Sequence, residues 1–209
     1  MSIETEICIY AKIGDFSGLM NPLESHAQCN LRNDKGSVRV RKITRGGNST
    51  YETTVKKKLK DSVSAKNIEI NRPCDEEYYE NFRSICVDEM VKDRFIFPLR
   101  KLSLLVDGQE DEIDLNAYRG SVDIQYEVDA FPKEGGGYHE WCKIDLELDA
   151  LIPILTKVIG DKDIKLNLKI SHLPFKPKEA ILSNTTDQSQ KAIIDKMRDT
   201  VMTRVIKDA

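Results

Sequence analysis

Residues 36–60, GSVRVRKITRGGNSTYETTVKKKLK, are the stretch that decides the fold expected for this chain. Apolar and polar side chains alternate on both sides of a Gly46-Gly47-Asn48 turn signal, which predicts a hairpin of two strands at 36–44 and 51–60. A period of two puts every second side chain on the same face of a strand. One face of this hairpin is therefore cationic, and it carries Arg39, Arg41, Lys56 and Lys58.

The same alternation recurs along most of the chain. It predicts further strands at 2–13, 65–71, 95–107 with a bend at Pro98, 121–131, 141–149 and 163–170. Helices are expected at 75–92, at 150–159 and, as an amphipathic C-terminal helix, at 191–207. This mixture of many strands and a few helices predicts an α+β protein. A linker-like stretch at 183–190 separates the strands from the last helix, so we expect one domain over 1–175 and a C-terminal extension over 176–209.

Acidic side chains are sorted by strand as well. Glu4 and Glu6 are in phase in the first predicted strand, Glu127 and Asp129 in a later one, and Asp145 and Glu147 in the next. Like charges held about 7 Å apart on one face repel each other, and a merely solvated face has little reason to sort them. The sorting favours a face on which cations bind a polyanion and acids hold Mg²⁺ or Mn²⁺. An ordinary half-buried sheet with a wet, charged face is the alternative.

Composition limits the classes of function. The chain has 209 residues, 40% of them hydrophobic, and a formal charge of −3, so it can bury a core and is poorly suited to coating nucleic acid. No signal peptide and no apolar run of ~20 residues is visible, which predicts a cytoplasmic protein with no membrane partner. Five cysteines without a C-x-x-C spacing predict reduced thiols and no zinc site.

The motifs taken in order resemble the CYTH, or triphosphate tunnel metalloenzyme, superfamily. An E-x-E strand matches Glu4–Glu6, an R-x-R strand matches Arg39–Arg41, and a T-x-K strand matches Thr54–Lys56. A strand bearing a glutamate at Glu69 and a basic strand with Arg100 follow. The most specific stretch is YEVDAF at 126–131, a glycine-containing turn, and KIDLEL at 143–148. The resemblance spans about residues 3–150 and departs from the family at Cys8, where the family has lysine, and at Asp145, where it has glutamate.

The resemblance implies an antiparallel, closed or nearly closed eight-stranded β-barrel with a polar, charged interior and flanking helices. It also implies metal-dependent hydrolysis of an inorganic, organic or nucleoside triphosphate by positioning, charge neutralisation and an oriented water. The implied catalytic residues are Glu4, Glu6, Glu127 and Asp129. The implied phosphate-binding residues are Arg39, Arg41, Lys56, Lys58 and Arg100. The implied ligands of Mg²⁺ or Mn²⁺ are Glu4, Glu6, Asp145 and Glu147.

Two other functions remain open for such a chain. Cys8 in place of the family lysine favours a module that binds a polyphosphate or nucleotide without turning it over, and a lyase similar to class IV adenylyl cyclases is the second alternative. The expected partner is a small-molecule triphosphate or nucleotide, and the one nucleic acid that fits is a triphosphate-ended RNA. The apolar stripe of the C-terminal helix could be buried on the barrel or in a homodimer.

Overall fold

In the computed structural model of the chain, the structure describes residues 2–16, 18–19, 21–33, 36–58, 65–86, 88–106, 109–118, 125–147, 151, 154, 164–167, 175, 177–183 and 185–204. Of these, the side chains at 2–6, 32–33, 58, 65–67, 104–106, 109–111, 118, 147, 164–167 and 202–204 lie outside the description. Among the described residues, no helix is long and apolar enough to cross a membrane.

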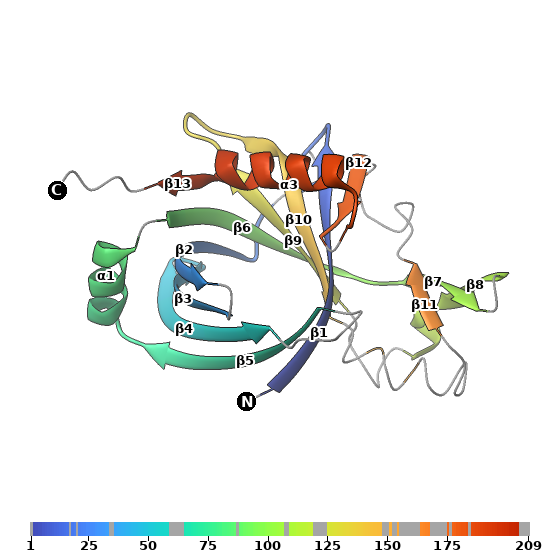
Figure 1. The fold of residues 1–209 in the computed structure, drawn as a ribbon, viewed down its shortest axis with the longest axis horizontal. Coiled ribbons are helices and arrows are strands. Elements are labelled where there is room, and N and C mark those ends of the chain that lie inside the picture. The colour runs from blue at the N-terminus through green and yellow to red at the C-terminus, as the bar shows by residue number, and fades with distance from the viewer. Residues whose placement is uncertain are drawn as a thin grey trace.

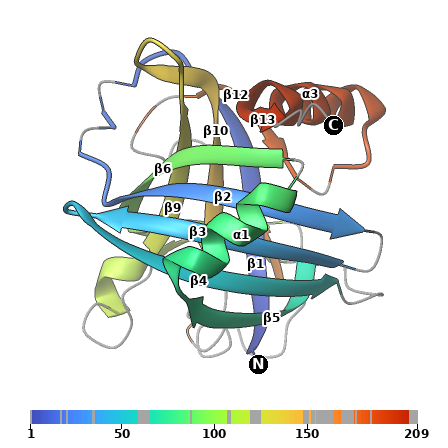
Figure 2. The same ribbon diagram turned by 90° about the vertical axis from the view of Figure 1, so that its left-hand side faces the viewer.

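Within these ranges the main element is a strongly curved, ten-stranded antiparallel sheet (Figures 1 and 2). Nine strands follow one hydrogen-bonded path, and the tenth, β13 (Met202–Arg204), pairs with β6. The path runs through β10 (Tyr138–Glu147), β9 (Gln125–Pro132), β6 (Asp88–Pro98), β2 (Glu24–Asn33), β3 (Gly36–Arg45), β4 (Asn48–Lys58), β5 (Ala65–Cys74), β1 (Ser2–Ile13) and β12 (Pro177–Leu182). β1 also pairs with β10 over Glu6–Lys12.

The prediction of an eight-stranded, closed or nearly closed barrel is wrong. Over the described residues the main sheet has ten strands, and a separate three-stranded sheet joins β11 (Ile164–Asn167), β7 (Lys101–Val106) and β8 (Gln109–Asp114). No strand was predicted for the stretch that becomes β2, because the side chains that alternate with the polar ones at 24, 26, 28 and 30 are mostly small or polar, as at Ser25, Ala27 and Cys29. β12 pairs with β1, and no strand was predicted at its position. β11 corresponds to the strand predicted at 163–170, and it pairs with β7 of the smaller sheet.

The predicted hairpin is confirmed. β3 and β4 are joined at Gly46 and Gly47, which have φ of 55° and 84°. Positive φ at both central residues is what a two-residue hairpin turn requires, and glycine adopts it without a steric penalty. Arg45 then faces Asn48, and the register continues from there to Gly36 opposite Lys57.

The predicted helix at 75–92 is correct only in its first half. α1 (Glu76–Ile85) begins after Asp75, whose side chain accepts a hydrogen bond from the Tyr78 N–H at 2.7 Å, and it ends at Cys86. Residues from Asp88 onward form β6, which ends at Pro98, and the predicted bent strand at 95–107 is divided between β6 and β7. Figure 2 shows α1 lying across the outside of the sheet. There Tyr79 packs against Tyr51, with 5.6 Å between the centroids of the two rings.

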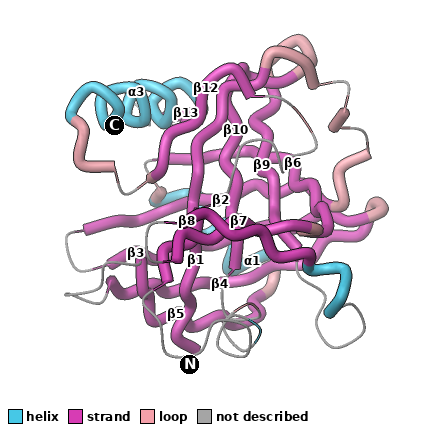
Figure 3. The backbone as a smooth tube through the Cα atoms, turned by 90° about the vertical axis from the view of Figure 1, so that its right-hand side faces the viewer, coloured by secondary structure: helices cyan, strands magenta, loops and turns pink. Residues whose placement is uncertain are grey.

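The main apolar core lies between the curved sheet and the smaller one. It joins Ile9, Val128 and Ile144 from the curved sheet to Leu102 on β7 and Ile113 on β8. The smaller sheet lies outside the curve, as Figures 1 and 3 show from two sides. The apolar faces of β1, β9 and β10 therefore point outward, and the opposite faces of these strands point into the curve.

The C-terminal helix is shorter than expected. α3 (Gln188–Val201) packs Ile194 and Met197 against Tyr10, Trp141 and Ile181, so its apolar stripe is buried within this chain. β13 follows it, and the rest of the predicted helix lies outside the described residues, as does most of the helix expected at 150–159. A short 3₁₀ helix, η1 (Leu115–Tyr118), follows β8.

Candidate functional site

The charge-bearing residues of seven strands share one face of the curved sheet. Side chains directly opposite one another in an antiparallel pair stand on the same face, and here Arg39 is opposite Thr54, Arg94 opposite Asp129, and Asp129 opposite Lys143. The charged face, as we call it, faces into the curve. Its described side chains include Glu24, His26, Gln28, Asn30, Arg39, Arg41, Glu52, Thr54, Lys56, Glu69, Met90, Lys92, Arg94, Glu127, Asp129, Lys143 and Asp145.

Two arginine side chains, the half-buried Arg39 and the buried Arg41, dominate one part of this face. Arg39 donates from Nη2 to Thr54 Oγ1 at 3.2 Å, and Arg41 pairs with Glu52. Burial and, second to it, the charge of Arg41 lower the pKa of Arg39 to about 10 against the opposing effect of Glu69. The Nε atoms of both arginines are buried without a hydrogen-bond partner among the described residues. This part of the face therefore has hydrogen-bond donors and positive charge to offer to an anion.

Glu69 on β5 belongs to the same part of the face. Its carboxylate lies 2.6 Å from Lys56 Nζ and 4.0 Å from Arg39 Nη2. The three predicted motifs R-x-R, T-x-K and the glutamate strand are thus brought together by the β3–β4–β5 pairing. Lys58 occupies the same face by register, opposite Asn67, but its side chain lies outside the description.

A buried ion-pair group occupies the neighbouring strands. Asp129 accepts hydrogen bonds from Arg94 at 2.8 and 3.0 Å and from Lys92, and Arg94 also contacts Glu127 at 2.6 Å. Burial by itself would raise the pKa of Asp129, but Lys92 and Arg94 outweigh it and hold this pKa well below the usual range. Both carboxylate oxygens of Asp129 are engaged. Asp129, predicted as catalytic, therefore holds Arg94 and Lys92 in position in this arrangement.

Acidic positions gather at β1, β9 and β10. Glu127 is opposite Asp145, and the next pair on the same face is Glu6 opposite Glu147. Burial raises the pKa of Glu127, and the charges of Asp129 and Asp145 raise it further against Arg94. Asp145 accepts from Lys143, but its Oδ1 is buried without a hydrogen-bond partner in the described part of the chain.

These acids fit a hard cation in kind and in position, because carboxylates from neighbouring strands repel one another until a cation neutralises them. Among the side chains that the structure describes, no three of His, Cys, Asp or Glu are grouped closely enough to hold a metal ion. The predicted ligands Glu4, Glu6 and Glu147 are outside that set, and only their backbone register places them.

Cys8 stands where the resembled family has lysine, and the structure provides a cation beside it. Cys8 is opposite Asp145, and burial raises the pKa of its thiol to about 12, so the thiol is neutral at physiological pH. The next contribution to this pKa is the opposing one of Lys143, whose ammonium group lies close enough to act on the thiol. Lys143 on β10 therefore supplies a positive charge near the position of the missing lysine.

The charged face does not include Arg100, predicted as a phosphate-binding residue, and it includes three cations that the sequence analysis did not name. Arg100 is exposed in the segment after β6 and is not on the charged face. Lys92, Arg94 and Lys143 are on it and were missed. A signal was available for the first two, because Lys92-x-Arg94 has the same spacing as Arg39-x-Arg41. This spacing was not used, because residues 75–92 were predicted to be a helix.

His26 gives this face a pH dependence that can be measured. It is 1% exposed, and its Nε2 lies 2.8 Å from Glu24 Oε1. Burial lowers the pKa of His26 to about 4, and Lys92, Arg94 and Arg41 lower it against the opposing effect of Glu24. An unfolded chain keeps a histidine pKa of about 6.5 and binds the proton first, so the free energy of unfolding should fall as the pH drops from 6.5 towards 4.

We expect this contribution to reach at most ~3 kcal/mol at about 1.4 kcal/mol per pKa unit. Urea denaturation at pH 7, 6 and 5 should show a steeper loss of stability in the wild type than in His26→Gln, which cannot take up the proton. Parallel losses in the two proteins would contradict a neutral, buried His26.

Comparisons with known proteins add little to this geometry. No protein-family model matches the chain, and no curated protein matches it. One solved structure, described as "Structure of PH1819 protein from Pyrococcus Horikoshii OT3", is similar with 12% sequence identity and a TM-score of 0.38, over 80% of this chain and 96% of that chain. A likeness of this degree carries no argument about fold or function, so membership of the family that the motifs resemble stays a prediction.

Proposed function

We propose that the charged face binds a triphosphate and hydrolyses it with the help of Mg²⁺ or Mn²⁺. The observation that carries this proposal is the pair of guanidinium groups of Arg39 and Arg41, whose buried Nε donors have no partner among the described residues, on the same face as a cluster of acidic positions. Buried like charges repel each other, and an anion between them would offset that repulsion while accepting their hydrogen bonds. Linear triphosphate is such an anion, and it could span several strands.

Each residue then has a defined part. Arg39, Arg41 and Lys56 bind phosphate oxygens, and Arg94, held in place by Asp129, extends this cationic surface towards β9. Glu127 orients the attacking water and accepts its proton, a role that suits a carboxylate whose pKa is raised by burial. Water attacks the terminal phosphorus, the bond to the bridging oxygen breaks, and this oxygen leaves with the remaining diphosphate, so the products are orthophosphate and a diphosphate. Asp145, Glu6 and Glu147 would hold the metal ion, which supplies charge neutralisation when bound.

The direct test is phosphate release with Mg²⁺ or Mn²⁺ from inorganic triphosphate, thiamine triphosphate, ATP and triphosphate-ended RNA. We expect release from at least one substrate, and its loss when EDTA removes the metal. Glu127→Gln should lower the rate at least tenfold while binding is kept, since general base catalysis contributes roughly 10²–10⁴-fold. Glu112→Gln is the matched control, because Glu112 pairs with Lys101 on the separate sheet. Equal rates in the two variants would contradict the role of Glu127.

A module that binds without turnover is the second candidate, and a specific observation favours it. Asp129 is fully engaged by Lys92 and Arg94, and the thiol of Cys8 contributes no charge at neutral pH. Calorimetric titration of the same ligands separates the two functions. Binding without release supports the module, whereas neither binding nor release would overturn both proposals.

A further inference from the structure

One row of the charged face is uncharged and differs from its neighbours. β2 lies between β3, with Arg39 and Arg41, and β6, with Lys92 and Arg94. Its side chains on this face include His26, Gln28 and Asn30, which are 1%, 5% and 7% exposed. The three residues follow one another at the two-residue period of a strand, so they form a continuous polar row beside the arginines.

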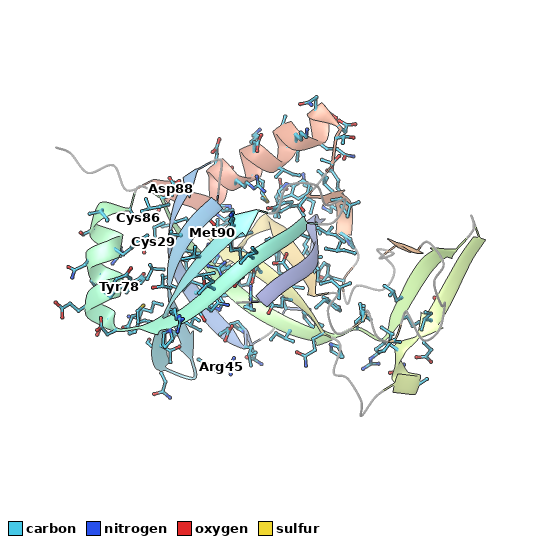
Figure 4. All side chains as sticks on the ribbon, turned by 60° about the horizontal axis from the view of Figure 1, so that its bottom comes forward. Cys29, Arg45, Tyr78, Cys86, Asp88 and Met90 are labelled. Atoms are coloured by element: carbon cyan, nitrogen blue, oxygen red, sulfur yellow. The ribbon has the colours of Figure 1, made fainter. Side chains whose placement is uncertain are left out.

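Each residue of this row has a buried polar atom without a hydrogen-bond partner among the described residues: His26 Nδ1, Gln28 Oε1 and Asn30 Nδ2. Folded proteins leave very few buried polar atoms unpaired, so a consecutive row of three points to a partner outside the described residues, and a bound ligand would supply it. The other bonds of the row are local. His26 Nε2 is 2.8 Å from Glu24, and Gln28 Nε2 faces Met90 Sδ at 3.8 Å. Met90 is one of the side chains labelled in Figure 4.

The unpaired atoms include both acceptors and donors. His26 is neutral, with its pKa lowered to about 4 by burial, and Nε2 is the nitrogen that bonds the Glu24 carboxylate, so Nδ1 is left as an acceptor. Gln28 Oε1 is a second acceptor, and Asn30 Nδ2 is a donor. A phosphate group has only acceptors near neutral pH and would face two acceptors here. The row therefore suits a neutral group that donates and accepts hydrogen bonds, next to the cations that suit phosphates.

We infer that His26, Gln28 and Asn30 form a subsite for the organic part of a triphosphate ester, a group with both hydrogen-bond donors and acceptors such as a nucleoside or an aminopyrimidine. This inference rests on the proposed function, because it assumes that the phosphates lie on the neighbouring arginines. It goes beyond that proposal by naming an ester with a polar organic group, rather than inorganic triphosphate, as the preferred ligand.

The first test is calorimetric titration with ATP, thiamine triphosphate and methyl triphosphate. Methyl triphosphate carries the same triphosphate group as the other esters but has no hydrogen-bonding organic group, so its comparison with ATP isolates the contribution of the subsite. We expect ATP or thiamine triphosphate to bind at least tenfold more tightly than methyl triphosphate. Whichever of ATP and thiamine triphosphate binds more tightly shows whether the subsite prefers a nucleoside or an aminopyrimidine. Equal affinities for all three would overturn the subsite and leave the proposed function standing. No binding of any of them would overturn the proposed function itself.

The second test removes the hydrogen bonds and keeps the size of the side chain. Gln28→Leu should weaken the favoured organic ester about tenfold, the loss of roughly one hydrogen bond, and change the affinity for methyl triphosphate less than twofold. Asn30→Leu should do the same if Gln28→Leu fails to fold. Asn81→Leu is the control, because Asn81 is an exposed carboxamide on α1, outside the curved sheet. An equal loss for both ligands would show that the row supports the structure and does not contact an organic group.

Discussion

Asp129→Leu is expected to be the most destabilising single substitution of the charged face. It removes the carboxylate that pairs with Lys92 and Arg94, and side chains of all three residues are at most 12% exposed. Removing one partner of a buried ion pair costs about 3–5 kcal/mol, because the remaining charge stays buried without compensation. For a chain of this length that loss corresponds to a fall in Tm of about 10 °C, measurable by calorimetry or by circular dichroism.

A matched control and a double substitution make this prediction sharp. Asp195→Leu removes an aspartate whose side chain is 72% exposed and lies 3.8 Å from Arg198, and it should change the stability by less than ~0.5 kcal/mol. Adding Lys92→Met to Asp129→Leu should recover part of the lost stability, since one of the uncompensated cations is gone. A fall in Tm no larger than that of the Asp195 variant would contradict the ion-pair description.

Arg39→Met is expected to have the opposite effect: the affinity for triphosphate falls, while the free energy of unfolding does not. Burial and the neighbouring charge of Arg41 lower the pKa of Arg39 to about 10, which means that the folded protein disfavours this charge. Methionine covers a similar apolar area without the charge. We therefore expect the free energy of unfolding to stay constant or rise, while the affinity for triphosphate falls about 100-fold, or ~2.7 kcal/mol.

The reason for this combination is that a ligand-binding charge is retained against stability when the ligand supplies its missing partner. Calorimetric titration and thermal unfolding of the same sample measure both quantities. Arg72→Met, on the exposed part of β5, is the control and should change neither. A large loss of stability in Arg39→Met without a change in affinity would make Arg39 a structural residue and would remove the basis of the proposed function.

Much of the charged face could be predicted from the sequence alone. The i, i+2 spacing of Arg39 with Arg41, and of Glu127 with Asp129, sets each pair on one face of its strand, and the Gly46-Gly47 turn sets the β3–β4 hairpin. These are local properties. The alternation of a strand and the positive φ of a glycine turn depend on residues only a few positions apart.

The rest depended on contacts between distant segments. Residues 88–92 fit a helical spacing as well as a strand, and only the pairing of β6 with β2 and β9 makes them a strand and brings Lys92 and Arg94 to the site. The exposed position of Arg100, the extra strands β12 and β13, and the neutral row of β2 were decided in the same way.

The sequence by itself thus determined which side chains share a face within each strand, because that follows from backbone geometry at short range. Only the tertiary structure decided which strands are neighbours, and with them the pairing of Asp129 with Arg94, the neutrality of His26 and the unpaired atoms of Gln28 and Asn30. The physical reason is that burial and Coulomb interactions depend on distance in space, and residues 35 to 68 positions apart become neighbours only when the whole sheet has formed.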